Sequence, residues 1–129
     1  MDILVTNNPL AEERYRDRLQ VDYLEAPMLD VLTRARDYIH KGRQLLTHPL
    51  YGSVKPNETP YKSVLISETR GTTDEQSVCM IEECIMALGR FQPKPIPEHC
   101  LPDLQTVDLL LLAGNETVYD SREYKMGFA

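Results

Sequence analysis

Short apolar runs alternate along this chain with segments in which apolar residues recur every three or four positions. This alternation predicts strands separated by helices. The short runs predict four strands, at Ile3–Thr6, Val21–Glu25, Gln44–Thr47 and Lys62–Glu68. Helical periodicity fills the two gaps between the first three, from Pro9 to about Arg18 and from Met28 to about Lys41. Successive strand–helix–strand units favour parallel pairing with right-handed crossovers. We therefore expect a three-layer α/β fold with an open, mainly parallel four-stranded sheet flanked by helices.

Several residues mark the expected helix ends. Asn8 is a good N-cap candidate because a proline follows it at the first helical position. Gly42 stands where a left-handed residue closes the second helix. The Thr72-x-x-Glu75 pattern is typical of a capping box and predicts a helix that runs to about Phe91.

The last third of the chain contains a proline-rich stretch, residues 92–101, which we interpret as an internal linker within one domain of residues 1–129. After it, residues 102–119 carry apolar side chains at helical spacing, with Pro102 near the start. A strand at Val107–Leu112 is the competing interpretation, and the spacing favours the helix.

Composition excludes several classes of protein. A formal net charge of −6 disfavours binding to the phosphates of nucleic acids. The longest purely apolar run, Leu109–Ala113, is far too short to cross a membrane, and the N-terminal residues lack the pattern of a signal peptide. Cys79, Cys84 and Cys100 have neither metal-ligand nor redox-pair spacing, so we expect reduced thiols, no bound metal and a cytoplasmic location. No glycine-rich nucleotide fingerprint occurs, and no cofactor is expected.

Residues 48–60 form the longest connection without helical or strand patterning. Connections of this length in compact domains are usually binding loops, lids or disordered linkers. Three prolines stiffen this one, and its apolar residues can anchor it, which favours an ordered loop that displays polar groups.

The predicted topology brings this loop close to the end of the first strand. Ligands of open α/β sheets bind beyond the carboxyl ends of the strands, and the loop would begin at the edge where Asn7 and Asn8 lie. The first helix would also point its free N–H groups there. We predict a site for a small carboxylate- or phosphate-bearing anion, or for an acidic segment of a partner, formed by Asn7, Asn8, His48, Ser53, Lys55, Asn57, Glu58 and Tyr61.

Purely structural roles compete with binding roles at these positions. Asn8 before a proline is more often a helix cap than a ligand contact. His48 can hydrogen-bond loop carbonyls without meeting a substrate, and Asn57 can form a plain turn.

The chain resembles the GrdX family in three places. These are Thr6–Pro9, Asp37–Gly42 and, above all, the block from Leu46 to Ser63, whose sequence is LTHPLYGSVKPNETPYKS. GrdX proteins are small proteins encoded with components of the glycine, sarcosine and betaine reductases of amino-acid-fermenting anaerobes. The resemblance implies a cytoplasmic accessory protein of a selenium-dependent reductase system, with a reductase component as partner. It implies no catalytic residues.

Three functional interpretations remain open from the sequence. The first is an accessory protein that binds a ligand or partner subunit at the sheet edge under the 48–60 loop. The second is a small enzyme with His48 as general acid/base and Lys55 or the first helix holding an anion. The third is a partner that docks through a flat apolar patch around Leu50, Tyr51 and Tyr61.

Overall fold

The computed structural model describes residues 1–50 and 55–121, with side chains up to residue 114. It contains a three-stranded sheet in the order β2-β1-β3, in which β1 pairs parallel with β2 and antiparallel with β3. The strands and helices in chain order are β1 (Ile3–Thr6), α1 (Pro9–Tyr15), β2 (Gln20–Tyr23), α2 (Met28–His40), β3 (Ser63–Ile66), α3 (Glu75–Gly89), the 3₁₀ helix η1 (Glu98–Cys100) and α4 (Leu101–Ser121). Residues 102–119 are thus helical, as the spacing predicts. In this part of the chain, no helix combines the length and apolarity needed to cross a membrane.

The predicted four-stranded, mainly parallel sheet is wrong, although the protein is α/β. The error lies in the third and fourth strands. After α2, residues 44–47 run in the direction of β1, and the following loop brings the chain back as β3. The strand β3 lies between β1 and residues 44–47, and it runs antiparallel to both. A loop return gives antiparallel pairing, whereas a parallel pair needs a crossover such as α2.

The predicted strand Gln44–Thr47 is reduced to one isolated bridge, between Leu45 and Ile66. Side chains replace the missing ladder partners. The Thr47 hydroxyl accepts the Leu65 N–H at 3.1 Å, and the Ser77 hydroxyl accepts the Leu45 N–H at 2.9 Å. Residues 44–47 therefore cover the outer edge of β3 without forming a regular strand.

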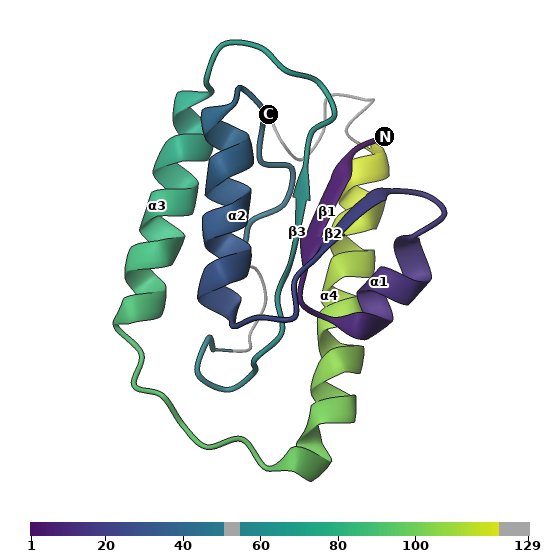
Figure 1. The fold of residues 1–129 in the computed structure, drawn as a ribbon, viewed down its shortest axis with the longest axis vertical. Coiled ribbons are helices and arrows are strands. Elements are labelled where there is room, and N and C mark those ends of the chain that lie inside the picture. Colours follow the sequence, from purple (N-terminus) through teal and green to yellow (C-terminus); the bar gives the residue numbers. More distant parts are fainter. Residues whose placement is uncertain (51–54, 122–129) are drawn as a thin grey trace.

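Helices cover both faces of the sheet (Figure 1). Side chains alternate between the faces along each strand, which splits the core into two clusters. The cluster between the sheet and helices α2 and α3 consists of Ile3, Val5, Val31, Leu32, Ala35, Ile39, Val64, Ile66, Ile81 and Cys84. The cluster between the sheet and helices α1 and α4 consists of Leu4, Ala11, Tyr15, Leu46, Leu65 and Leu112. The chain leaves α3 at the lower end of the molecule and passes beneath it to reach α4 (Figure 1).

Two of the three predicted helix-end signals are confirmed. The Asn8 side chain caps α1 by accepting the Leu10 N–H at 3.0 Å. Gly42, at φ 95°, ends α2 as the left-handed residue. The predicted capping box at Thr72 is wrong. Asp74 caps α3 instead, accepting both the N–H and the hydroxyl of Ser77. An aspartate directly before the helix took the role assigned to a threonine two residues earlier.

Strand and helix ends differ from prediction elsewhere by a few residues. β2 starts at Gln20 instead of Val21 and ends at Tyr23 instead of Glu25. β3 is shorter than the predicted Lys62–Glu68 at both ends. α1 ends at Tyr15, where the Arg18 and Leu19 N–H groups turn back to bond the Tyr15 carbonyl, and so does not reach Arg18.

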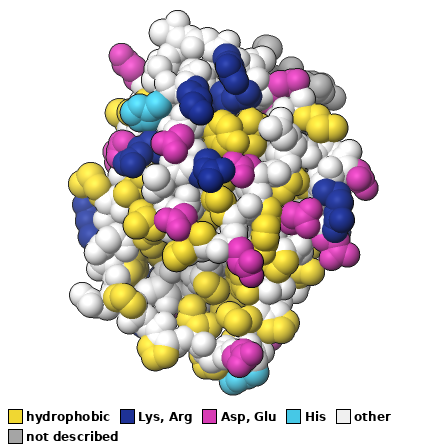
Figure 2. All heavy atoms as spheres, viewed as in Figure 1, with side chains coloured by type: hydrophobic (Ala, Val, Ile, Leu, Met, Phe, Trp, Pro, Cys, Tyr) yellow, Lys and Arg dark blue, Asp and Glu magenta, His cyan; other side chains and the backbone are white. Residues whose placement is uncertain are grey.

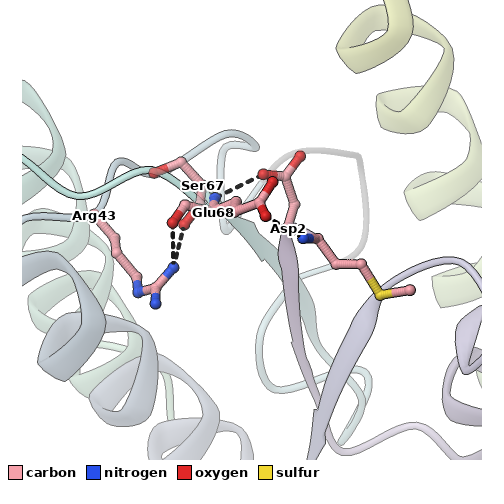
Figure 3. Close-up of polar contacts among 5 residues, drawn as sticks. Asp2, Arg43, Ser67 and Glu68 are labelled. Atoms are coloured by element: carbon pink, nitrogen blue, oxygen red, sulfur yellow. Dashed lines mark hydrogen bonds and ion pairs between the residues drawn. The ribbon is translucent and has the colours of Figure 1, made fainter.

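Polar contacts hold the amino-terminal end of β1 against the segment that follows β3 (Figure 3). The Asp2 carboxylate accepts the Glu68 N–H at 2.7 Å, and the Met1 ammonium pairs with the Glu68 side chain. Arg43 donates to the carbonyls of Ser67 and Glu68 at 2.9 and 2.7 Å. Hydrogen bonds therefore close this end of the sheet.

We expect Gly42→Ala to destabilise the protein by more than about 1 kcal/mol, because the left-handed backbone alone costs a Cβ roughly that much. An added Cβ would also lie 2.1 Å from the Gly71 carbonyl oxygen, which belongs to the backbone. Gly89→Ala is the matched control. It ends a helix with nothing within 4 Å of the new atom, and should be neutral or slightly stabilising. Urea unfolding of both variants tests this, and equal stabilities would contradict the role given to Gly42.

Candidate functional site

A cleft with a volume of about 860 Å³ opens at the carboxyl ends of β1 and β2. We call it the proline cleft because five of its lining residues are prolines. The lining residues are Asn7, Pro9, Tyr23, Glu25, Ala26, Pro27, Met28, Leu29, Pro56, Asn57, Thr59, Pro60, Tyr61, Leu88, Phe91, Pro93, Lys94, Ile96 and Leu101. Figure 2 shows hydrophobic side chains gathered over the lower part of the molecule, whereas the dark blue Lys and Arg side chains gather higher on this face. The position is the one predicted from the strand ends, but the lining is mostly apolar.

Asn7 lines the proline cleft, and its side chain also connects the segments that form the cleft walls. Its side-chain NH₂ donates to the carbonyls of Ala26 and Pro60 at 2.9 and 2.8 Å. Its side-chain oxygen accepts the Lys62 N–H at 2.8 Å. The side chain thereby ties the β2–α2 connection and the end of the long loop to β1. These bonds give Asn7 a structural role, and its predicted ligand contact remains untested.

Asn8 is fully buried and anchors α4. Besides capping α1, its side-chain NH₂ donates to the Gln105 carbonyl and to the Asp108 carboxylate, each at 2.9 Å. The same carboxylate oxygen accepts the Ser63 hydroxyl at 2.7 Å, and Ser63 in turn bonds Thr6. A hydrogen-bonded network therefore joins β1, β3, α1 and α4 beside the proline cleft.

This network disfavours an anion at the start of α1. The Asn8 side chain already satisfies one of the free N–H groups there. The Asp108 carboxylate, only 7% exposed, lies on the other side of the same amide and would repel a second negative charge.

The described part of the long loop contributes mainly turn structure. Lys55 and Glu58 close a turn on themselves: the Glu58 carboxylate accepts the Lys55 N–H, and the Glu58 N–H returns to the Lys55 carbonyl. Asn57 lines the proline cleft, and its NH₂ donates to the Gln92 carbonyl at 2.8 Å, which fastens the loop to the α3–α4 connection. Ser53 and Tyr51 lie outside the described residues.

Two tyrosines, Tyr61 and Tyr23, line the proline cleft together with Phe91. The Tyr61 hydroxyl accepts a hydrogen bond from the Gln105 side chain at 2.8 Å, which fixes its ring beside α4. Burial raises the pKa of Tyr23, and the nearby Glu25 and Tyr61 raise it further. The Tyr23 phenol is therefore neutral at physiological pH, and the charged residues in the cleft wall are Glu25 and Lys94.

His48 lies at a different site from Asn7, Asn57 and Tyr61. It lines a second cleft, of about 510 Å³, together with Leu50, Glu83, Cys84, Met86, Ala87 and Arg90. We call this the thiol cleft. The His48 Nδ1 accepts the Leu50 N–H at 3.1 Å, so the ring stabilises its own loop, through an N–H group and not through the loop carbonyls named as the structural alternative. Of the predicted residues, three line the proline cleft and one, His48, lines the thiol cleft, whereas Asn8, Lys55 and Glu58 line neither.

The three cysteines are free, with Cys79 exposed, Cys100 half-buried and Cys84 buried. Burial raises the pKa of the Cys84 thiol, while the Leu50 N–H and Lys62 oppose that effect. Cys84 is therefore a neutral thiol and a poor nucleophile, despite its place beside His48. Within residues 1–50 and 55–121, no three histidine, cysteine, aspartate or glutamate side chains gather so as to hold a metal ion.

Lys62 is an unusual residue that the sequence does not single out for the site. The residue is only 9% exposed, and burial lowers its pKa, although the Asp108 carboxylate and the Cys84 thiol act in the opposite direction. It precedes β3 at a position that looks like any surface lysine. Other residues of the proline cleft were missed for a similar reason. Pro27 and Phe91 lie at the boundaries of predicted helices, and Leu29 fits the apolar stripe of the predicted helix that begins at Met28. Only the fold brings them together.

Fold and clefts define a small α/β protein with a mixed three-stranded sheet and two surface clefts near one end of it. A family model described as GrdX-like protein matches residues 3–115. That match covers most of the chain, and the protein therefore belongs to the GrdX-like family, as the resemblance in the central block indicates. Comparison with curated proteins and with solved structures found no significant match.

We expect Asn8→Asp to cost roughly 2–4 kcal/mol of stability at pH 7. The new carboxylate keeps the cap but replaces the amide that donates to Asp108 at 2.9 Å, so two buried like charges meet. Gln44→Glu is the control, because it makes the same change from amide to carboxylate at an exposed position, and its cost should stay below about 1 kcal/mol. Urea unfolding measures both. An Asn8→Asp variant as stable as Gln44→Glu would show that the network carries little stability.

We expect Lys62→Met to raise the free energy of unfolding at pH 7 by roughly 1 kcal/mol, because an apolar chain of similar volume avoids burying an ammonium. The sign of the pH dependence follows from the lowered pKa of Lys62. The ammonium is penalised only in the folded state, so the wild type regains stability as the pH rises from the folded-state pKa towards the unfolded value of 10.5.

The advantage of Lys62→Met should therefore shrink as the pH approaches 10.5. Unfolding curves at pH 7, 9 and 10 measure it. Lys94→Met, at an exposed position, should show no such trend. A Lys62→Met advantage that is absent at pH 7, or constant with pH, would contradict this electrostatic account.

Proposed function

We propose that this protein is an accessory protein of the glycine reductase system, and that the proline cleft binds an apolar segment of a reductase component. The family membership supports the association with that system, because GrdX proteins are encoded with the reductase components. Such a role would place the protein in the cytoplasm beside its partner.

The observation that carries this proposal is the chemistry of the proline cleft. Its walls are mostly prolines and aliphatic or aromatic side chains, with Glu25 and Lys94 as the charged residues. Depletion of charge and enrichment in aromatic residues are typical of the centres of protein interfaces. One charge of each sign offers no net attraction for a small anion, so the lining favours an apolar occupant over an anionic one.

The cleft is also held in shape before any partner arrives. Asn7 ties two of its walls together, and Asn57 fastens the loop to the α3–α4 connection. Prolines in both connections restrict the backbone further. A rigid binding surface loses little conformational entropy on association, which raises its affinity for a partner segment.

An enzymatic role for His48 has less support. Its Nδ1 is used by the Leu50 N–H, and the neighbouring Cys84 thiol is held neutral by burial. We therefore retain the binding interpretation for the proline cleft and assign no catalytic residue.

The proposal predicts that Leu29→Asp weakens partner binding. Leu29 is 47% exposed on the cleft wall, at the second position of α2, where an aspartate is favoured by the helix dipole, so the fold should be retained. The charge would lie against the bound apolar segment. We expect an affinity at least 10-fold lower, since losing a well-packed apolar contact at an interface costs more than about 1 kcal/mol.

Biolayer interferometry against each purified glycine reductase component tests this expectation. Leu110→Asp is the matched control: Leu110 is 65% exposed on α4, does not line the cleft, and its variant should bind as the wild type does. The proposal fails if no component binds the wild type, or if Leu29→Asp and Leu110→Asp bind equally well.

A further inference from the structure

The two edges of the sheet differ in how their main-chain groups are covered. Residues 44–47 cover the outer edge of β3. On the other side β2 is the outermost strand, and it pairs with β1 alone (Figure 1). An uncovered edge presents unpaired N–H and C=O groups to which another extended chain can bond.

Alternate residues of β2 direct their main-chain groups away from β1. The N–H groups of Gln20 and Leu24 donate to carbonyls of β1 and of the residue before it, at 3.0 and 2.8 Å. Bonding residues alternate along a strand of a parallel pair, so the N–H and C=O groups of Val21 and Tyr23 point to the open side. Within residues 1–50 and 55–121, no hydrogen bond occupies these four groups. The edge of β2 is therefore open to an added strand.

This open edge leads into the proline cleft. Tyr23 is the last residue of β2, is 39% exposed, and lines the cleft with its side chain. Glu25, Ala26 and Pro27 follow it in the chain and continue the cleft wall. An extended segment that lies in the cleft can therefore reach the open main-chain groups of Tyr23 and then those of Val21.

A second copy of this chain fits the open edge poorly. An antiparallel pairing of β2 with β2 that used all the open groups would set Asp22 opposite Asp22 of the second copy, and like charges directly opposite each other destabilise a sheet. The Asp22 carboxylate is already paired, with the Arg34 guanidinium at 2.9 and 2.8 Å and with the Tyr38 hydroxyl at 2.8 Å. The edge therefore favours a segment of another protein, with an uncharged side chain opposite Asp22.

We propose that the apolar segment bound by the proline cleft continues as an extended strand along β2 and adds a fourth strand to the sheet. This inference rests on the function proposed for the cleft and specifies the form in which the partner is bound. Main-chain hydrogen bonds to Val21 and Tyr23 hold the segment. The side chains of these two residues share one face of β2, where apolar side chains of the segment pack against them. The segment has no proline where its N–H bonds β2.

Val21→Pro tests the added strand, because it removes an N–H that points to the open side and leaves the bonds to β1 in place. Proline is tolerated on an edge strand when the missing N–H faces solvent, so the fold should be retained. We expect the affinity for the bound glycine reductase component, measured by biolayer interferometry, to fall at least about 10-fold. Glu75→Pro is the matched control. Glu75 is exposed at the first position of α3, where proline is favoured, and lines neither cleft, so this variant should bind as the wild type does.

Hydrogen exchange with residue resolution, measured by mass spectrometry, needs no substitution. In the free protein the Val21 amide should exchange faster than the Asp22 amide, which faces β1. Binding of the component should slow exchange of the Val21 amide at least about 10-fold. Val21 does not line the proline cleft, so a segment confined to the cleft would leave this amide unprotected.

The outcomes separate this inference from the function proposed for the cleft. If a component binds and Leu29→Asp weakens it, but Val21→Pro binds as the wild type does or the Val21 amide stays unprotected, the added strand is overturned and the function of the cleft stands. Equal losses for Val21→Pro and Glu75→Pro would also overturn the added strand. If no component binds the wild type, the proposed function fails and this inference fails with it. Should Val21→Pro not fold, the exchange of the Val21 amide decides alone.

Discussion

The arrangement of this protein depends on two adjacent asparagine side chains at the end of β1. Asn7 binds the β2–α2 connection and the end of the long loop, and Asn8 caps α1 and holds α4 through Gln105 and Asp108. Both are buried, and each uses its oxygen and its NH₂ group. A buried amide stripped of these partners would cost more than the bonds themselves contribute. The pair therefore fixes how the layers meet at this end of the sheet.

Asn7 also fixes the segment that leads into β3. Its side chain binds the Pro60 carbonyl, in the wall of the proline cleft, and the Lys62 N–H. Only Tyr61 separates these two bonded residues, so one side chain holds residues 60–62 against the end of β1. A displacement of this segment by a ligand in the proline cleft would therefore also move Lys62, which immediately precedes β3.

Local signals in the sequence were sufficient for most elements and insufficient for the sheet. Helical spacing located all four helices, and Asn8 and Gly42 marked helix ends because capping chemistry is local. The pairing partners of residues 44–47 and 63–66 depended on a loop return that no local pattern encodes. Hydroxyl groups of Thr47 and Ser77 also replaced ladder bonds, an outcome visible only once the chain is folded. Strand order is a tertiary property, and it was mispredicted for that reason.

Of the candidate site, the sequence predicted where a cleft lies and not what lines it. The rule for strand ends pointed to the region around Asn7, where the proline cleft opens, but it treated polar residues as ligand contacts. In the structure many of them satisfy backbone groups, because a crowded strand end needs such partners before it can offer any to a ligand. The exposed surface of the proline cleft is formed instead by residues that the sequence places at helix boundaries and in linkers, such as Pro27 and Phe91. Lys62 shows the same effect in reverse: an ordinary lysine in the sequence becomes a buried residue because it leads into β3, which lies between β1 and residues 44–47.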